Sequence, residues 1–187
     1  MARLRPLIGG LTAALAFGAF AYAQTAAPTP APAAVSPSFT ATIKTPDGAS
    51  VGTAVLTDAP SGVLMRIEVK SLTPGWHGMH FHEKGDCTDA KFMNSGGHVQ
   101  MAGMKMPHGL LNPQGPDFGD LPNLYVQADG TAKAEVFSTK VSLKPGSDRS
   151  VLLDADGSAL VIHAGPDDQA SQPIGGAGAR VACGVIR

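Results

Sequence analysis

Hydrophobic and polar residues alternate along several short segments of this chain. Phe39–Ile43, Val51–Thr57 and Val63–Val69 each show this period of two. The turn-forming sequences PDG and PSG separate them. A period of two is typical of strands that bury one face. These segments therefore predict an antiparallel meander.

The same pattern returns in the second half of the chain. Leu124–Ala128 and Ala132–Phe137 flank an Asp-Gly pair, which is typical of a tight hairpin turn. Two further strands are predicted at Ser158–His163 and Arg180–Ile186. About eight strands with no convincing helix predict an all-β fold. We expect a Greek-key β-sandwich or flattened barrel with long loops.

The segment Gly75–His82 is predicted to be a strand that carries chemistry. Residues two apart in a strand point to the same face. His80 and His82 can therefore present their imidazoles to one ion, while Phe81 points toward a core. Two histidines on an exposed strand face have the same spacing, so the pattern alone leaves both interpretations open.

Residues 83–122 show no periodicity, although they contain many residues that can bind metals. An aperiodic stretch of this length is usually functional or disordered. It contains His98, His108, Asp117 and Asp120. All six histidines lie between positions 77 and 163, and this clustering indicates a metal site. Imidazole suits copper, zinc, iron and nickel, so ligand type alone does not select the metal.

The first 23 residues have the features of a signal peptide. Arg3 and Arg5 precede the apolar stretch Pro6–Phe20, and Ala21-Tyr22-Ala23 has the small-x-small form of a cleavage site. The apolar stretch is shorter than the about 20 residues of a spanning helix. No cysteine near the cleavage site could accept a lipid. We therefore expect export to a bacterial periplasm without a stable membrane anchor.

The remaining chain is predicted to contain a tether and one domain. Residues 24–37 are rich in proline and alanine, which is typical of a disordered tether, and residues 38–187 can bury one core. The composition is globular, with 43% hydrophobic and 16% charged residues. Loss of Arg3 and Arg5 changes the formal charge from −1 to −3. No basic stripe is present, which argues against nucleic-acid binding.

Six motifs of residues 38–187 resemble those of the copper–zinc superoxide dismutases, in particular the exported bacterial type. They are GWHGMHFHEKGDC, GGH, HGLLNP, GDLPNL, IHAGPDD and GGAGARVACGVI, in this order. The resemblance implies an enzyme that converts superoxide to oxygen and hydrogen peroxide by cycling between Cu(II) and Cu(I), with zinc as the structural partner.

The resemblance also implies two metal sites that share one imidazole. The copper ligands would be His80, His82, His98 and His163. Zinc would be bound by His98, His108 and Asp120. In the family reaction His98 also carries a proton to the developing peroxide.

Further roles follow from the same resemblance. Asp167 would join a copper histidine to a zinc histidine, and Arg180 would attract the superoxide anion. His77 would hydrogen-bond to the backbone and bind no metal. Cys87 and Cys183 would form a disulfide, as expected for two cysteines in an exported domain.

The chain departs from the family at the zinc loop. The family carries a histidine where this chain has Asp117. Zinc accepts carboxylate oxygen, so Asp117 is either a fourth ligand or a loop acid beside a weakened or empty site. The loop also contains Met101, Met104 and Met106, which could bind Cu(I) or simply fill apolar space.

The segment that normally guides the anion is short here. It spans Gln169–Ile174 and contains no lysine, so guidance is expected to depend more on Arg180 and the copper. The alternatives are a copper-only dismutase and a non-catalytic periplasmic copper- or zinc-binding module of the same fold. Loss of Arg180 or of a copper histidine would favour the module, but all are present. The sequence leaves open whether the protein forms a homodimer.

Overall fold

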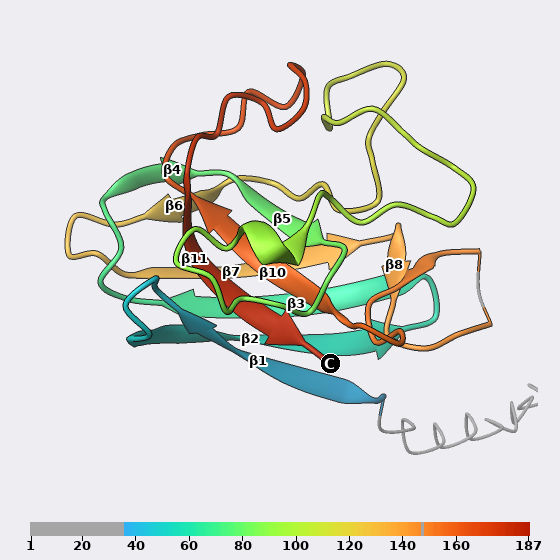
Figure 1. The fold of residues 1–187 in the computed structure, drawn as a ribbon, viewed down its shortest axis with the longest axis horizontal. Coiled ribbons are helices and arrows are strands. Elements are labelled where there is room, and N and C mark those ends of the chain that lie inside the picture. The colour runs from blue at the N-terminus through green and yellow to red at the C-terminus, as the bar shows by residue number, and fades with distance from the viewer. Residues whose placement is uncertain (1–35, 147) are drawn as a thin grey trace, which may run out of the picture. The chain divides into compact units, whose positions relative to one another are not determined.

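A curled antiparallel sheet forms the frame of the domain (Figure 1). The computed structural model describes residues 36–146 and 148–187. The seven strands follow the order β5-β10-β11-β1-β2-β3-β7. Their bounds are β1 Ser38–Lys44, β2 Ser50–Ala59, β3 Gly62–Val69, β5 Met79–His82, β7 Ala132–Ser138, β10 Ser158–His163 and β11 Arg180–Ile186. The predicted all-β fold is confirmed.

Smaller elements complete the fold. β4 (Gly75–His77) pairs with β6 (Leu124–Val126) in an antiparallel sheet. β8 (Val141–Ser142) pairs in parallel with β9 (Ser150–Val151), and η1 (Met93–Ser95) is one 3₁₀ turn. The sequence did not predict β8, β9 or η1, because segments this short show no period.

The predicted strand Gly75–His82 is divided into β4 and β5 at Gly78. The Gly78 N–H donates to the carbonyl oxygen of Gly165, 2.8 Å away. A Cβ on Gly78 would lie 2.8 Å from the Cβ of Ala177, so this approach requires glycine. At Gly78 the chain therefore changes its partner from β6 to β10.

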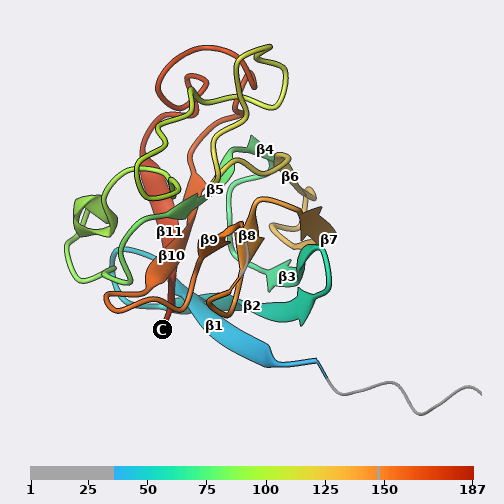
Figure 2. The same cartoon turned by 90° about the vertical axis from the view of Figure 1, so that its right-hand side faces the viewer.

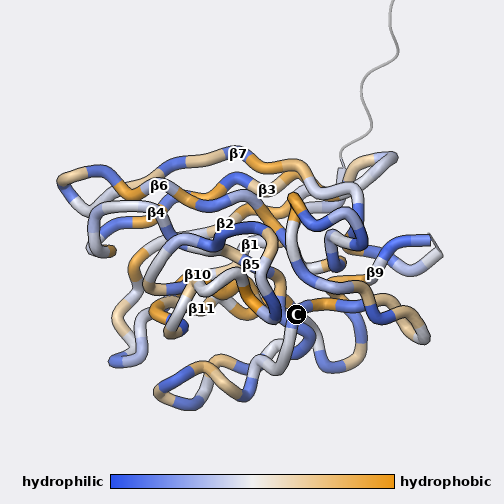
Figure 3. The backbone as a smooth tube through the Cα atoms, turned by 90° about the horizontal axis from the view of Figure 1, so that it is seen from above, coloured by the Kyte–Doolittle hydropathy of each residue, from blue (hydrophilic) through white to orange (hydrophobic). Residues whose placement is uncertain are grey.

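The core is built by the alternation that the sequence shows. Val63, Met65, Ile67 and Val69 of β3 are buried, and the residues between them are more exposed. Figure 3 shows hydrophobic and hydrophilic stretches following one another along these strands. One face of the meander therefore packs inward, as predicted.

Strand β10 is buried on both faces. Leu160 and Ile162 belong to the main core, whereas Val161 lies in a second cluster with Phe92 and Cys183. The loop that follows β5 therefore covers the outer face of β10. This second layer keeps water from the strand that carries His163.

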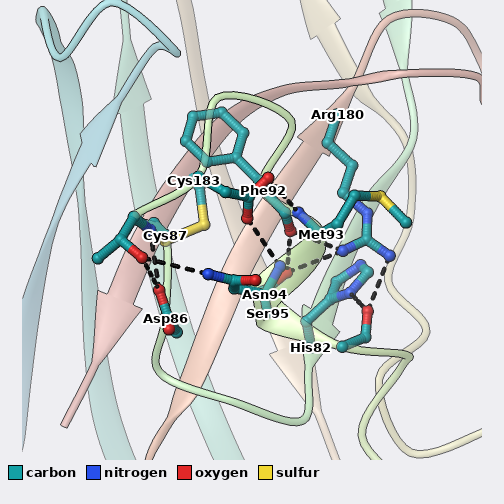
Figure 4. Close-up of a disulfide and its surroundings, with 12 residues drawn as sticks. His82, Asp86, Cys87, Phe92, Met93, Asn94, Ser95, Arg180 and Cys183 are labelled. Carbon is teal, nitrogen blue, oxygen red and sulfur yellow. Dashed lines mark hydrogen bonds between the residues drawn. A yellow bond between two sulfur atoms is a disulfide. The ribbon is translucent and has the colours of Figure 1, made fainter.

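The disulfide between Cys87 and Cys183 fixes that loop to β11, as expected (Figure 4). The loop is also ordered by Asp89, whose carboxylate accepts hydrogen bonds from the N–H groups of Lys91, Met93 and Asn94. Side-chain bonds thus replace the regular hydrogen bonding of a helix or sheet.

Two long loops rise on the same side of the sheet. They span residues 98–120 and 164–179, and Figures 1 and 2 show them close together above the strands. The predicted signal peptide (residues 1–23) lies outside the described residues, as does all of the predicted tether except Ser36 and Pro37. Within the described part of the chain, no helix has the length and apolar character needed to cross a membrane.

The disulfide joins residues 96 positions apart, so its removal should destabilise the domain strongly. Closing a loop of this length stabilises by about 4–5 kcal/mol in the chain-entropy model. The free energy of unfolding of the variant with both Cys87→Ser and Cys183→Ala should be lower than that of the wild type by an amount of this order. Urea titration of the metal-free proteins measures the difference. Chemical reduction of the wild type serves as the control and should produce a similar loss. An unchanged unfolding midpoint would contradict the prediction.

Candidate metal centre

Strand β5 directs two histidines away from the core. Met79 and Phe81 pack in the main core, while His80 and His82 point to the opposite face. Both imidazoles are fully buried, because the loop residues cover them. The structure thus excludes an exposed pair of surface histidines.

The backbone of Phe81 places the loop residues beside this strand. Its N–H donates to the Gly119 oxygen and its own oxygen accepts from Val99 N–H, both at 2.9 Å. These bonds set His82 opposite His98 and His80 opposite Asp120. A Cβ on Gly119 would lie 2.2 Å from the Phe81 oxygen, so only glycine permits this approach.

One ring nitrogen of each predicted copper histidine lacks a hydrogen-bond partner within the described residues. Buried polar atoms in this condition are rare and require an explanation. A bound metal would provide it, because each nitrogen offers a lone pair. The four atoms are His80 Nδ1, His82 Nε2, His98 Nε2 and His163 Nε2.

The other nitrogen of three of these rings is fixed by a partner. His80 Nε2 lies 2.7 Å from Asp167 Oδ2, and His82 Nδ1 lies 3.0 Å from the Gly96 oxygen. His163 Nδ1 lies 3.0 Å from the Gly178 oxygen. Such partners fix the tautomer and leave the opposite nitrogen available to a metal.

Burial keeps these imidazoles neutral. It lowers the pKa of His80 and of His163 to about 4. Burial also lowers the pKa of His82 well below its usual value. A neutral imidazole can coordinate a metal without first losing a proton. The three side chains also lie close together, since one ligand atom from each falls within 4.8 Å of the others.

A second group of ligand atoms is rich in carboxylates. His98 Nδ1 lies 2.8 Å from Asp117 Oδ2 and 3.4 Å from Asp120 Oδ1. His108 Nδ1 lies 2.5 Å from Asp120 Oδ1. One ligand atom from each of His80, His98, His108 and Asp120 lies within 4.8 Å of the others. Asp117 is not part of that group of four, but it is buried and contacts His98 directly.

The second group of ligand atoms forms the carboxylate-rich half of the centre. Its carboxylates raise the pKa values of the histidines beside them, opposite to the shift in the buried histidines of the first group. Burial lowers the pKa of His108, but hydrogen bonds to Asp120 and Asp167 outweigh burial and raise the pKa to about 10. For His98, hydrogen bonds to Asp117 and Asp120 likewise outweigh burial and raise the pKa. Burial raises the pKa of Asp117. In Asp120 the hydrogen bonds with His108 and His98 outweigh burial and lower the pKa.

Asp167 connects the two halves, in the arrangement that the resemblance implies. Its Oδ2 lies 2.7 Å from His80 Nε2 and its Oδ1 lies 3.0 Å from His108 Nε2. The side chain of Asn123 holds the Asp167 backbone, accepting from its N–H at 2.9 Å and donating to its oxygen at 2.8 Å. Sequence reasoning missed Asn123, because it lies 44 residues away along the chain and carries no local signal.

Arg180 is held by the loop that the disulfide fixes (Figure 4). Its Nη1 donates to the Phe92 oxygen at 2.7 Å and to Ser95 Oγ at 3.0 Å. Its Nη2 donates to the Gly96 oxygen at 2.8 Å, and the same oxygen contacts His82. One carbonyl group therefore links the guanidinium to a predicted copper histidine.

Two hollows meet at Arg180. One of about 400 Å³ is lined by His98, Asp117 and Lys105, among others. The other, of about 620 Å³, is lined by His163 and Lys91, among others. Two lysines, Lys105 and Lys91, therefore line the same hollows as Arg180, in addition to the cations that the sequence analysis named. Both lysines lie far in sequence from Gln169–Ile174, where the resemblance directed attention.

The remaining predicted residues have structural roles. Both ring nitrogens of His77 contact backbone oxygens, those of His163 and Thr73, at 2.6 and 2.7 Å. Met101 and Met106 pack against the main core. Met104 is 48% exposed. This arrangement favours apolar filling over a Cu(I) site in the methionine loop.

Comparisons with known proteins agree on one family. The family model described as copper/zinc superoxide dismutase (SODC) matches residues 50–186. The chain is 57% identical over 150 residues to superoxide dismutase [Cu-Zn] of Caulobacter vibrioides, covering 80% of this chain and 86% of that protein. It is 44% identical over 142 residues to superoxide dismutase [Cu-Zn] 2 of Aquifex aeolicus, covering 75% and 81%.

Solved structures give the same result for the fold. A SOD-like protein from Bacillus subtilis matches with a TM-score of 0.74 at 37% identity, covering 79% of this chain and 97% of that one. Cu/Zn superoxide dismutase from Brucella abortus matches with a TM-score of 0.63 at 33% identity, covering 81% and 100%.

The contrast in pKa values predicts that zinc binding releases more protons than copper binding. The pKa of His108 is raised to about 10, so this ring carries a proton at neutral pH, whereas lowered pKa values keep His80, His82 and His163 neutral. The raised pKa of His98 does not distinguish the two metals, because this imidazole is predicted to be shared by both sites. Zinc binding must displace the proton of His108. Zinc affinity should therefore rise with pH between about 6.5, the usual histidine pKa, and about 10, the raised pKa of His108.

Calorimetric titration of the metal-free protein in buffers of different ionisation enthalpy measures this release. Copper titration is the internal control. Equal release for the two metals at pH 7 would contradict the prediction.

Proposed function

The chain belongs to the copper/zinc superoxide dismutase family, and we propose the residues through which it acts. It is an oxidoreductase whose substrate is superoxide and whose cofactors are copper and zinc. Two superoxide anions and two protons yield one oxygen and one hydrogen peroxide. One anion loses an electron, and the other gains that electron and takes up both protons.

The four unpartnered ring nitrogens carry the proposal for copper. They belong to His80, His82, His98 and His163, and we assign all four as copper ligands. The ring centroids of His80 and His98 lie 4.1 Å apart, and those of His80 and His163 lie 4.9 Å apart. An all-imidazole set suits copper.

The proposed zinc ligands are the four side chains of the carboxylate-rich half. They are His98, His108, Asp117 and Asp120. Nitrogen and carboxylate oxygen donors are normal for zinc, and four ligands without an open position are typical of a structural site. Asp117 is favoured as a ligand over a loop acid, because its side chain is buried and its Oδ2 lies 2.8 Å from His98 Nδ1.

The protein groups around the metals have distinct tasks. When bound, copper supplies one-electron chemistry between Cu(II) and Cu(I), and zinc has no redox chemistry of its own. His98 Nε2 is the atom that holds and returns a proton, because the carboxylates occupy Nδ1. Arg180 orients the anion, since its guanidinium is fixed beside His82 through Gly96.

Guidance of superoxide depends on local charge. The mature chain would be net negative, yet Arg180, Lys91 and Lys105 line the two hollows. A local positive field raises the rate of encounter with an anion, and salt screens it. Superoxide dismutases are a known example of this steering, so the effect is general to the family and only its residues in this chain are proposed.

The alternatives from the sequence are less well supported. A non-catalytic module would be expected to lack a copper histidine or Arg180, and the chain retains all of them. A copper-only dismutase would be expected to lack an organised zinc half. In this chain Asp117 and Asp120 both lie beside His98 Nδ1, and Asp120 also contacts His108.

We also propose export and self-association. Residues 1–23 would direct the chain to the periplasm, which cell fractionation and sequencing of the mature N-terminus would test. The homodimer would use an exposed apolar face of Trp76, Tyr125, Leu110 and Leu111. The hollow in that face has no charged lining residue among those described, so two copies would meet without charge repulsion. Light scattering of the purified protein would test this.

The copper assignment predicts a selective effect of His163→Ala. Copper binding and dismutation should both be lost, because one of four ligands is removed. Zinc should be retained, since His163 is not in the zinc set, and circular dichroism should still show a folded β protein. Metal analysis and pulse radiolysis are the measurements. Full activity with bound copper would refute the assignment.

The zinc assignment predicts graded effects at position 117. Asp117→Asn retains the shape but loses the charge, and zinc affinity should fall by about tenfold or more, as for other ligand and partner changes. Asp117→His should retain zinc at least as well as the wild type. Zinc content after dialysis against graded chelator measures both. Equal retention in the wild type and Asp117→Asn would make Asp117 a loop acid, and absence of zinc from the wild type would favour the copper-only enzyme.

A further inference from the structure

The side chain of Gln172 binds both backbone groups of His108. Gln172 Oε1 accepts from His108 N–H at 2.9 Å, and Gln172 Nε2 donates to the His108 oxygen at 2.8 Å. A neighbouring strand would make the same two bonds with this residue. His108 belongs to no strand, so the side chain supplies the pairing that the local fold lacks.

The position of the His108 backbone matters because its ring has two fixed contacts. Nδ1 contacts Asp120 and Nε2 contacts Asp167. A small displacement of the backbone would lengthen both contacts at once. His108 is buried, and without Gln172 its N–H would lose its hydrogen bond at a cost in free energy.

We propose that Gln172 is a positioning residue for zinc binding through His108. This inference rests on the proposed function, because it requires His108 to be a zinc ligand. Groups that orient a metal ligand typically contribute about 10- to 100-fold to metal affinity. Gln172 differs from the usual case in that it holds the backbone of the ligand and not its ring.

The same side chain connects zinc to the path of the anion. Gln172 and the next two residues, Pro173 and Ile174, line the hollow that contains Arg180. His108 held by zinc would thus fix Gln172, and Gln172 would fix this wall. Loss of the two bonds should loosen the wall as well as the ligand.

The chain contains a matched control for this arrangement. Gln100 makes the same two bonds to Met106, accepting from its N–H at 2.9 Å and donating to its oxygen at 3.2 Å. Met106 lies two residues before His108 and is not a proposed ligand. Changes at Gln100 therefore report the general effect of losing such a pair of side-chain to backbone hydrogen bonds in this loop.

The test compares Gln172→Met with Gln100→Met in the full mature protein. Methionine retains the length of the side chain and removes both hydrogen bonds. Zinc affinity is measured by chelator competition, and the absorption spectrum of Co(II) bound in place of zinc reports ligand geometry. We expect Gln172→Met to weaken zinc binding by about 10- to 100-fold and to alter the Co(II) spectrum. Gln100→Met should leave both close to the wild type.

Other outcomes would overturn the inference. Wild-type affinity and spectrum in Gln172→Met, or equal losses in both variants, would show that Gln172 has no special role. His108→Ala separates this failure from failure of the proposed function. If that variant loses zinc while Gln172→Met does not, only the inference fails. If His108→Ala retains zinc, the ligand set itself is wrong and the inference fails with it.

A second variant keeps the inference testable if Gln172→Met does not fold. Gln172→Glu retains an acceptor but, when ionised, loses the donor to the His108 oxygen. It should therefore weaken zinc binding relative to the wild type at one fixed pH, as measured by chelator competition, and Gln100→Glu is its matched control. Wild-type affinity in Gln172→Glu, or an equal loss in Gln100→Glu, would refute the role of the two hydrogen bonds.

Discussion

Two backbone hydrogen bonds at Phe81 organise the metal centre. They attach Gly119 and Val99 to the middle of β5, between the two histidines of that strand. Each attachment brings one loop residue into register with a histidine, Asp120 with His80 and His98 with His82. The centre is thus a short, irregular extension of the sheet. The regular backbone of β5 therefore positions loops that have little regular structure of their own.

The two halves of the centre handle charge in opposite ways. In the copper half, burial disfavours protonation of His80, His82 and His163 and keeps these three imidazoles neutral. In the zinc half, carboxylates raise the pKa values of His98 and His108, and His108 is protonated at neutral pH beside the ionised carboxylate of Asp120. Asp167 touches both halves through His80 and His108. The ligand frame can therefore be largely formed without metal, and metal binding replaces protons in a prepared site.

The parts of this structure that follow local rules could be predicted from the sequence. The alternation in residues 39–69 predicted β1, β2 and β3 nearly to the residue, and the spacing of His80 and His82 predicted their common face. The break at Gly78 could not be predicted, because it arises from contact with Gly165 and Ala177. The pairing of the cysteines came from family resemblance, not from local pattern.

The supporting residues escaped prediction for a related reason. Asn123 and Gln172 act on backbone groups 44 and 64 residues away, and a side-chain amide has no sequence signature for such a role. Lys91 and Lys105 reach the hollows around Arg180 only because the loops fold over the sheet. Ligand chemistry can be recognised from residue type and order. Its support depends on contacts that exist only after folding.

The position of the disulfide in the chain has a consequence for the order of maturation. Cys183 follows every proposed ligand and Arg180 in the sequence, and Cys87 precedes all of them except His80 and His82. The covalent ring can therefore close only after the whole set has been synthesised. Until then the loop over β10 is held only by non-covalent contacts. Formation of the disulfide is thus a late step in maturation, and it fixes the loop over β10 covalently.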